Sequence, residues 1–229
     1  MTMFKTAHRF ALSLTLCLPL ASAAPTIQQL VQRFDASQAK VQTLQAPFTL
    51  TTRRALMRTP AVTRGTLYLR GSDFVHFAFA PPEDLILHLT PKALISYSPA
   101  AGQGERLKIG FIRHTDRKFL GLGQKLSYLS DYFSLVCAES RDAGGTYLVT
   151  LQPRSLSLRK RMQLMQIWVD RESYLPRQIN WVERGGDSWF LELGPLQLNQ
   201  ALPTSVTGFR VPDGVPLRSE FSFFASRKK

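Results

Sequence analysis

The chain has 229 residues, and 29 Lys or Arg against 16 Asp or Glu give it a formal net charge of +13 at pH 7. Hydrophobic residues make up 44% of the sequence, which is typical of a globular core and excludes an intrinsically disordered chain. Two cysteines exclude a fold that several disulfides hold together.

The first 23 residues have the pattern of a cleavable secretion signal. Lys5 and Arg9 form a charged start, an apolar run covers 10–20, and Ala-Ser-Ala at 21–23 is a small-x-small cleavage site. The apolar run is shorter than the roughly 20 residues that cross a bilayer. We therefore predict export to the periplasm with cleavage near Ala23. An uncleaved anchor or a buried core helix is the alternative.

The remaining residues, 24–229, are enough for one domain with one core, and we predict a single soluble domain. Cys17 would be removed with the signal, and Leu16 before it does not suit a lipid-attachment site. Cys137 is then the one cysteine left, so no internal disulfide is predicted.

The predicted domain opens with a helical pattern. Thr26 is a suitable N-cap. Ile27, Leu30, Val31 and Phe34 then recur at the spacing of one helix face. This apolar face needs a partner surface.

From about residue 43 the apolar period changes to two, which indicates β-strands. The strands are short, and the intervals between them leave no room for crossover helices, which favours an antiparallel meander. The region 117–132 interrupts this pattern, and we expect one or two short helices there. The predicted strands lie at 48–51, 66–70, 74–79, 85–89, 93–97, 134–140, 146–152, 162–170, 174–183, 187–194 and 220–224.

These elements predict a mainly β fold of the α+β class. A sheet with so many strands and so few helices must curl to bury its apolar face. We therefore expect a curled antiparallel sheet of about 10–11 strands that forms an incomplete β-barrel. The N-terminal helix and short lid helices would cover it.

The sequence lacks the patterns that indicate an enzyme. His76, His88 and His114 show neither HExxH nor His-x-His spacing, so no metal site is predicted. No G-x-S-x-G elbow, phosphate loop or complete dinucleotide fingerprint is present. We predict a non-enzyme without cofactors. A catalytic group assembled only in space is the alternative.

The positive charge is spread over several clusters. Such clusters attract anionic lipid headgroups, nucleic acid or acidic proteins. For an exported chain we expect transient contact with an anionic membrane surface or a protein partner, and no nucleic acid. A basic polyanion-binding protein, or a surface that only keeps the chain solvated, is the alternative. The clusters contain Arg53, Arg54, Arg58, Arg64 and Arg70, then Arg113, Arg117 and Lys118, then residues 159–161 and 227–229.

Apolar side chains are abundant, with 15 Phe and three Trp. An ordinary core accounts for most of them. A curled sheet of about ten strands can nevertheless enclose more space than its side chains fill, as ligand-binding barrels do. Such a cavity would suit an acyl chain, because each buried methylene contributes about 0.8 kcal/mol.

Several short motifs follow one another over most of the predicted domain. They are Ile27–Phe34 with 41–48, Gly65–Arg70, Phe74–Phe77, the corner at 81–84, Leu94–Pro99, Trp168–Asp170, Leu175–Arg177 and Phe209–Val215. Each motif is weak, but their order resembles that of the periplasmic lipoprotein carriers of the LolA family. The outer-membrane receptor LolB is a looser match.

The resemblance implies a monomeric carrier that holds lipoprotein acyl chains in its cavity. Such a carrier receives cargo from an inner-membrane ABC transporter and passes it to an outer-membrane acceptor. The resemblance also implies that Arg70 latches the lid, although a plain surface arginine is the alternative. Gly71 replaces the proline of the family, His76 stands where an aromatic residue is usual, and the surface is unusually basic. A glycolipid or other acylated cargo, or a non-shuttling lipid-binding or sensor module of an envelope complex, is therefore an alternative.

We predict a cavity wall that is exposed when a lid opens. A shift of one residue in strand register would invert which side chains face inward. The predicted cavity residues are Phe34, Phe48, Leu50, Leu67, Leu69, Phe74, Phe77, Trp168, Ile179, Trp181 and Phe190. The predicted lid residues are Leu120, Leu122, Leu126 and Leu129.

Overall fold

The structure is a computed structural model that describes residues 25–108, 122–139 and 144–219. The predicted signal at 1–23, the lid residue Leu120 and the predicted strand at 220–224 lie outside the described residues. None of the described helices is long and apolar enough to cross a membrane.

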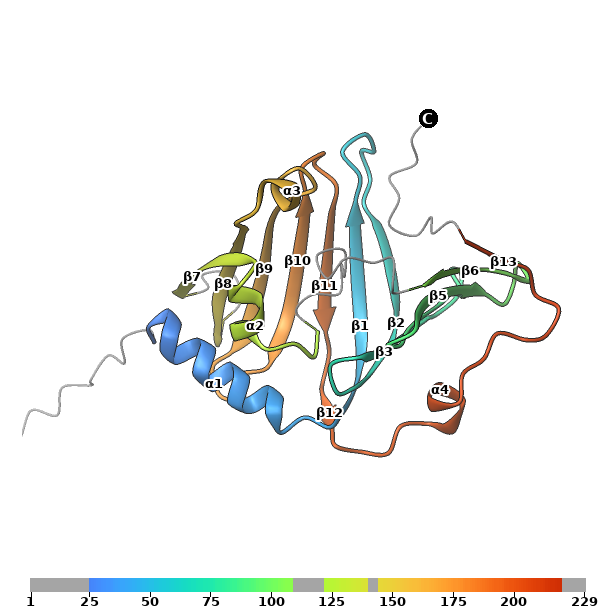
Figure 1. The fold of residues 1–229 in the computed structure, drawn as a ribbon, viewed down its shortest axis with the longest axis horizontal. Helices are drawn as coiled ribbons and strands as arrows, with labels where there is room; N and C mark the ends of the chain where they lie inside the picture. Colours follow the sequence, from blue (N-terminus) through green and yellow to red (C-terminus); the bar gives the residue numbers. More distant parts are fainter. Residues whose placement is uncertain (1–24, 109–121, 140–143, 220–229) are drawn as a thin grey trace, which may run out of the picture.

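The described residues form a mainly β fold with one 13-stranded sheet, an N-terminal helix and three short helices (Figure 1). Eleven of the described strands have four or more residues, and two have two residues each. In chain order the elements are α1 (Ile27–Ala39), β1 (Thr43–Arg53), β2 (Ala61–Arg70), β3 (Phe74–Phe79), β4 (Ile86–Leu89), β5 (Ala93–Ser98), β6 (Gln103–Lys108), α2 (Leu126–Ser130), β7 (Phe133–Glu139), β8 (Thr146–Pro153), α3 (Leu156–Arg159), β9 (Met162–Asp170), β10 (Pro176–Glu183), β11 (Ser188–Leu193), β12 (Gln197–Leu198), α4 (Thr204–Thr207) and β13 (Leu217–Arg218).

The predicted helix at 27–34 and the predicted strands between 48 and 194 are confirmed, most within two or three residues of their bounds. β1 and β2 are longer than the alternating segments within them, and β6 was not predicted. The segment QGERLK of β6 contains one large apolar residue, Leu107, so it carries no apolar alternation. The short helices α3 and α4 were also missed.

The sheet consists of two antiparallel meanders that are joined at one place. β1 to β6 pair in chain order, and so do β7 to β11. The first and last of these strands meet, because β1 pairs with β11 from Phe48 opposite Leu193 to Arg53 opposite Ser188. β13 adds to β6 as a parallel strand. The path therefore ends at β13 and β7, which do not pair with each other within the described part of the chain.

One face of the sheet, the inner face, carries most of the core. Directly paired residues point to the same side of a sheet, so one row can be followed across strands. Leu50 pairs with Leu191, Leu191 with Ile179, Ile179 with Ile167, and Ile167 with Val149. All five are buried. In Figure 1, α1 and α2 lie in front of this face at β7 to β10.

α1 forms for the local reasons that the sequence indicates. Thr26 and Gln29 make a capping box, in which the Gln29 N–H donates to the Thr26 hydroxyl and the Thr26 N–H donates to the Gln29 side chain. Leu30 and Phe34 are fully buried, and Ile27 and Val31 pack beside the core. The apolar face of the helix therefore lies on the sheet.

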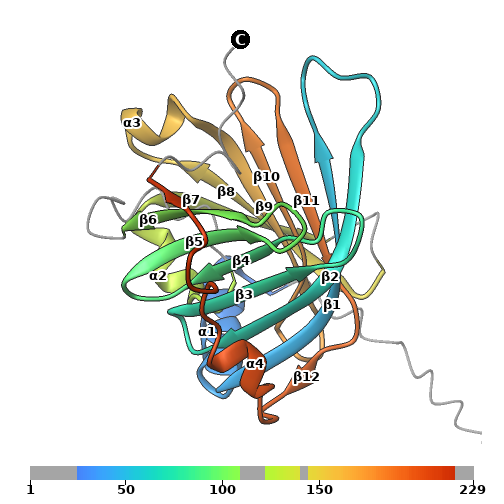
Figure 2. The ribbon, with the colours of Figure 1, turned by 90° about the vertical axis from the view of Figure 1, so that its right-hand side faces the viewer.

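The opposite, outer face carries a second buried cluster on β3 and β4. His76 and His88 are paired, with their Nδ1 atoms 3.0 Å apart, and both are buried. The Phe209 ring lies 5.4 Å and 5.0 Å from the two imidazoles, and the Phe74 ring lies 5.1 Å from that of His88. Phe209 belongs to the C-terminal segment, which crosses this side of β3 to β5 (Figure 2). The two histidines thus form the surface on which the C-terminal segment packs through Phe209.

The histidine pair predicts a loss of stability in acid. The pKa of both side chains is lowered from 6.5 to about 4, by burial for His88 and by burial together with the neighbouring His88 for His76. Below pH 6.5 the unfolded chain therefore binds protons that the folded chain does not, so stability is complete above pH 6.5 and is lost towards pH 4. We expect the free energy of unfolding to fall by roughly 3 kcal/mol between pH 7 and pH 4.5.

Urea unfolding at several pH values tests this expectation. The variant His76→Gln/His88→Gln keeps hydrogen-bonding side chains but cannot ionise, so its stability should depend much less on pH over this interval. An equal pH dependence in the variant and the parent chain would show that other groups are responsible.

Candidate functional site

The candidate site is the apolar inner face beneath α1 and α2. Its wall contains an aromatic group in which the Phe48 ring meets Phe77 at 5.2 Å and Phe79 at 5.1 Å, both edge to face. Trp181 and Trp189 continue the wall on β10 and β11, where they are paired. These contacts bury large apolar rings on strands from both meanders.

Trp181 introduces one polar atom into this wall. Its side chain is 8% exposed, and its indole Nε1–H is buried without a hydrogen-bond partner among the described residues. A buried donor without a partner costs about 1–3 kcal/mol. The inner face therefore offers a hydrogen-bond donor to a polar group that enters it, such as the carbonyl of an acyl ester.

Eight of the 11 predicted cavity residues lie together. Phe34 reaches the inner face from α1, and the other seven belong to its strands. Five of these seven are less than 5% exposed, and the other two, Leu50 and Trp181, are each 8% exposed. The seven strand residues are Phe48, Leu50, Leu67, Leu69, Phe77, Ile179 and Trp181.

Three predicted cavity residues, Phe74, Trp168 and Phe190, lie on the outer face, which corrects the predicted set. Phe190 pairs with Asn180, the neighbour of Ile179, and so points away from it. Trp168 meets Phe190 there, edge to face at 5.6 Å.

The physical reason for the correction differs between strands. In β3, Phe74 to Phe77 are all buried, because the outer cluster covers one side and the core covers the other, so the strand shows no alternation. Trp168 and Phe190 are half-buried aromatic residues on the outer side of alternating strands. Large apolar size was a misleading guide to the face at these positions.

The described lid residues are well buried. Leu122, Leu126 and Leu129 are each 2% exposed or less, and α1 and α2 contact each other and β7. The two oxygens of the Asp35 carboxylate accept hydrogen bonds from the Leu126 N–H at 2.7 Å and the Ser127 N–H at 3.3 Å. Asp35 thus caps α2 from α1.

Sequence reasoning missed Asp35. The signal that could have found it is weak: Lys125 occupies the N-cap of α2 and makes no side-chain capping bond, so the helix needs an acceptor from elsewhere. Only the packing of α1 against α2 identifies which acceptor that is.

Among the described residues, Arg70 lies on the outer face, away from α1 and α2. It pairs with Phe74 on the outer face, and its guanidinium lies 4.8 Å over the Phe74 ring. The neighbouring Leu69 points inward instead. The polar contact between the helices that cover the inner face comes from Asp35 rather than from Arg70.

The rim of the lid contains a pocket of about 390 Å³ between the end of α1, the β2–β3 turn and the segment before α2. A Cβ atom on Gly123 would lie 2.8 Å from the Gly71 carbonyl oxygen, so two backbones pack closely here. Both glycines have positive φ, which favours glycine. The Oε1 of Gln124, beside this pocket, is buried without a hydrogen-bond partner within the described part of the chain.

No group of three or more His, Cys, Asp or Glu in the described ranges could hold a metal ion. Cys137 is half-buried on the inner face, opposite Val149, and burial raises the pKa of its thiol.

No protein-family model matches the chain, and no curated protein matches it. Solved structures do match it. An uncharacterised conserved protein from Thermus thermophilus has a TM-score of 0.52 at 12% identity, over 84% of this chain and 98% of that one. A LolA superfamily protein from Nitrosomonas europaea has a TM-score of 0.42 at 12% identity, over 80% of this chain and 97% of that one. The Mycobacterium tuberculosis lipoprotein LppX has a TM-score of 0.42 at 12% identity, over 78% of this chain and 99% of that one. At this identity the likeness concerns the fold alone, and the two scores below 0.5 describe a distant similarity.

The two hydrogen bonds from Asp35 to α2 predict how much this residue stabilises the packing of α2 on α1. Asp35→Ala removes two charge-assisted hydrogen bonds and leaves two N–H groups of α2 without acceptors, so we expect the free energy of unfolding to fall by about 1–2 kcal/mol. The amide hydrogens of Leu126 and Ser127 should also exchange faster. Urea unfolding and hydrogen exchange measure the two effects.

Asp131→Ala is the matched control, because Asp131 is exposed at the other end of α2 and its side chain makes no hydrogen bond to the described part of the chain. It should change stability by less than about 0.5 kcal/mol. Equal effects of the two substitutions would show that Asp35 does not act as the cap.

Proposed function

We propose that this chain is a periplasmic carrier that binds the acyl chains of lipoproteins, or of a related acylated molecule, on its inner face. In this proposal the sheet is curled into an incomplete barrel, the mature protein is one domain over 24–229, and α1 and α2 act as a lid. Its donor is an inner-membrane transporter and its acceptor lies at the outer membrane.

The observation that carries the proposal is the continuity of the apolar inner face. The row of buried residues runs from β8 through β9, β10 and β11 to β1, and Leu67 and Phe77 extend the face through β2 to β3. The helices α1 and α2 cover part of it. An acyl chain needs such a dry wall, because its binding comes from apolar area removed from water.

The lid residues support the proposal because their side chains are aliphatic, as an acyl chain is. Leu122, Leu126 and Leu129 fill the inner face when the lid is closed. An acyl chain can replace these contacts with similar ones, so it stabilises an open state by its higher affinity for that state. The donor on Trp181 adds a polar contact for an ester or amide next to the chain.

The three tryptophans allow a direct test, since Trp181 and Trp189 lie on the inner face and Trp168 lies on the outer face. Bromine atoms quench indole fluorescence on contact. A brominated fatty acid should therefore quench a variant that retains only Trp181, with the others changed to Phe. It should leave a variant that retains only Trp168 nearly unquenched.

The Trp168-only variant is the matched control, because it has the same number of indoles and the same ligand. The non-brominated fatty acid controls for effects of binding on the fold. Equal quenching of the two variants, or no quenching of either, would contradict binding on the inner face.

A second measurement separates a carrier from a non-shuttling lipid-binding or sensor module. A carrier that diffuses between membranes should move a labelled acylated peptide from donor to acceptor vesicles at a rate proportional to protein concentration. Binding without transfer would favour the sensor alternative and contradict shuttling.

A further inference from the structure

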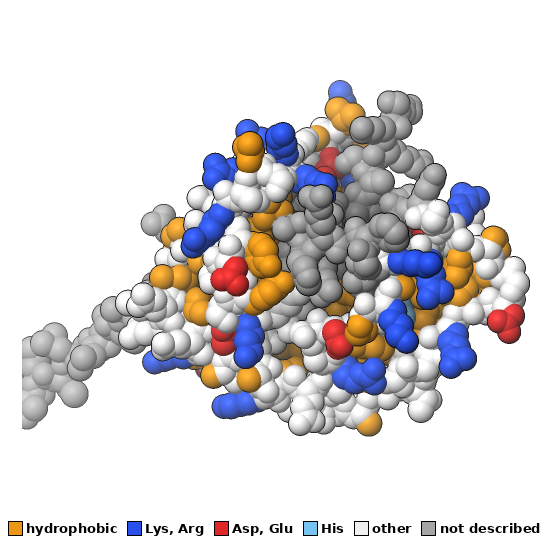
Figure 3. Space-filling view, viewed as in Figure 1, with side chains coloured by type: hydrophobic (Ala, Val, Ile, Leu, Met, Phe, Trp, Pro, Cys, Tyr) orange, Lys and Arg blue, Asp and Glu red, His pale blue; other side chains and the backbone are white. Residues whose placement is uncertain are grey.

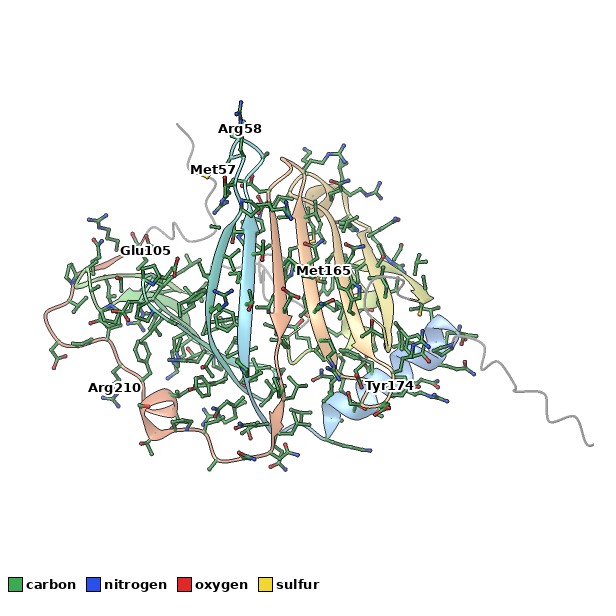
Figure 4. The ribbon with its side chains drawn as sticks, turned by 180° about the vertical axis from the view of Figure 1, so that it is seen from behind. Met57, Arg58, Glu105, Met165, Tyr174 and Arg210 are labelled. Atoms are coloured by element: carbon green, nitrogen blue, oxygen red, sulfur yellow. The ribbon has the colours of Figure 1, made fainter. Side chains whose placement is uncertain are left out.

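One end of the sheet carries the most exposed apolar side chains described in this chain. Leu56 is 100% exposed and Met57 is 69% exposed, both in the β1–β2 loop, and Leu156 at the start of α3 is 69% exposed. Figure 4 shows Met57 and Arg58 at the tip of the β1–β2 hairpin, beyond the end of the sheet. Exposed apolar side chains that gather on one patch with a polar rim mark a site of protein or membrane contact.

Three loops form this end of the molecule, and hydrogen bonds join them. They are the β1–β2 loop (54–60), α3 with its flanks (154–161) and the β10–β11 turn (184–187), which we call the tip surface. The Asp187 carboxylate accepts from the Ala55 N–H at 2.9 Å and pairs with Arg54 at 2.8 Å. The Arg184 N–H donates to the Arg161 carbonyl at 2.9 Å. The loops are therefore held in one arrangement.

The apolar side chains of the tip surface lie among basic ones. Together with the flanking residues Arg53 and Glu183, the tip surface contains eight Lys or Arg and two acidic residues, Glu183 and Asp187. In Figure 3, Lys and Arg side chains gather around apolar ones over α3 and at the tip of the hairpin. The eight basic residues are Arg53, Arg54, Arg58, Arg154, Arg159, Lys160, Arg161 and Arg184.

We propose that the tip surface docks on an anionic lipid membrane, with Leu56, Met57 and Leu156 entering the headgroup region. Basic side chains close to a membrane are attracted to anionic headgroups, and apolar side chains gain by leaving water at the acyl boundary. Both components are present on this one surface.

The shape of the surface favours a membrane over an acidic protein. Leu56 projects from a loop and is completely exposed. It therefore does not belong to a flat apolar patch of the kind that packs against a protein partner. A fluid lipid interface can close around a single projecting side chain. Docking here does not require that the inner face binds acyl chains, and the tip surface lies at the end of the sheet away from α1 (Figure 1).

Vesicle sedimentation of the chain without residues 1–23 tests this docking. The protein should sediment with vesicles of phosphatidylcholine mixed with phosphatidylglycerol, much less with phosphatidylcholine alone, and less at high salt. Leu56→Ser/Met57→Ser and Arg58→Glu/Lys160→Glu should each lower the partition coefficient by about tenfold or more.

Two control variants place equivalent changes elsewhere on the exposed surface. Val136→Ser/Leu198→Ser removes exposed apolar groups, and Lys92→Glu/Arg210→Glu reverses exposed charges. Both should retain the partition coefficient of the parent within about twofold, since surface changes away from the contact have small effects. Urea unfolding checks that every variant is folded.

Several outcomes would overturn membrane docking at the tip surface. They are equal sedimentation with neutral vesicles, equal losses in the control variants, and full binding by Leu56→Ser/Met57→Ser. The last result together with a loss in Arg58→Glu/Lys160→Glu would indicate a general attraction to polyanions, including acidic proteins. The fatty-acid experiment uses the inner face and no membrane, so the two proposals can fail separately.

Discussion

The pairing of β1 with β11 is the constraint on which the rest of the structure depends. Each meander forms from neighbouring strands, and the core contains buried residues from both of them. The pairing from Phe48–Leu193 to Arg53–Ser188 aligns the apolar rows of both meanders on one face. It joins residues about 140 positions apart, so forming it costs the conformational entropy of closing a long loop. The burial of the shared core offsets this cost.

In the N-terminal meander, strand β3 is buried on both sides, because the C-terminal segment covers its outer face. His76 and His88 form a neutral pair, and Phe209 packs on both rings. The C-terminal segment is thereby fixed on β3 and β4 far from the inner face. The proposed ligand-binding face and the covered outer face therefore share strand β3 without sharing side chains, because the two sets of side chains alternate along it.

The lid and the tip surface lie at different ends of the sheet. α2 has five residues, which is too short for a helix to be stable by itself, so it depends on Asp35 and on buried leucines. Elements with so few supports open at low free-energy cost. The tip surface is instead tied together by the contacts of Asp187. A tip surface held together by hydrogen bonds and a short helix with few supports are consistent with the proposed exchange of cargo beside a membrane.

The sequence by itself determined where α1 and most strands occur, because capping and apolar period are local. The helix that begins after Thr26 and strands β3 and β9 were predicted at or near their observed bounds. Tertiary structure alone decided which face each strand presents, and it moved Phe74, Trp168 and Phe190 to the outside. It also brought Asp35 of α1 to the start of α2, a contact that sequence reasoning did not predict. Those features depend on register and on pairing between distant segments, which residue type and local spacing do not encode.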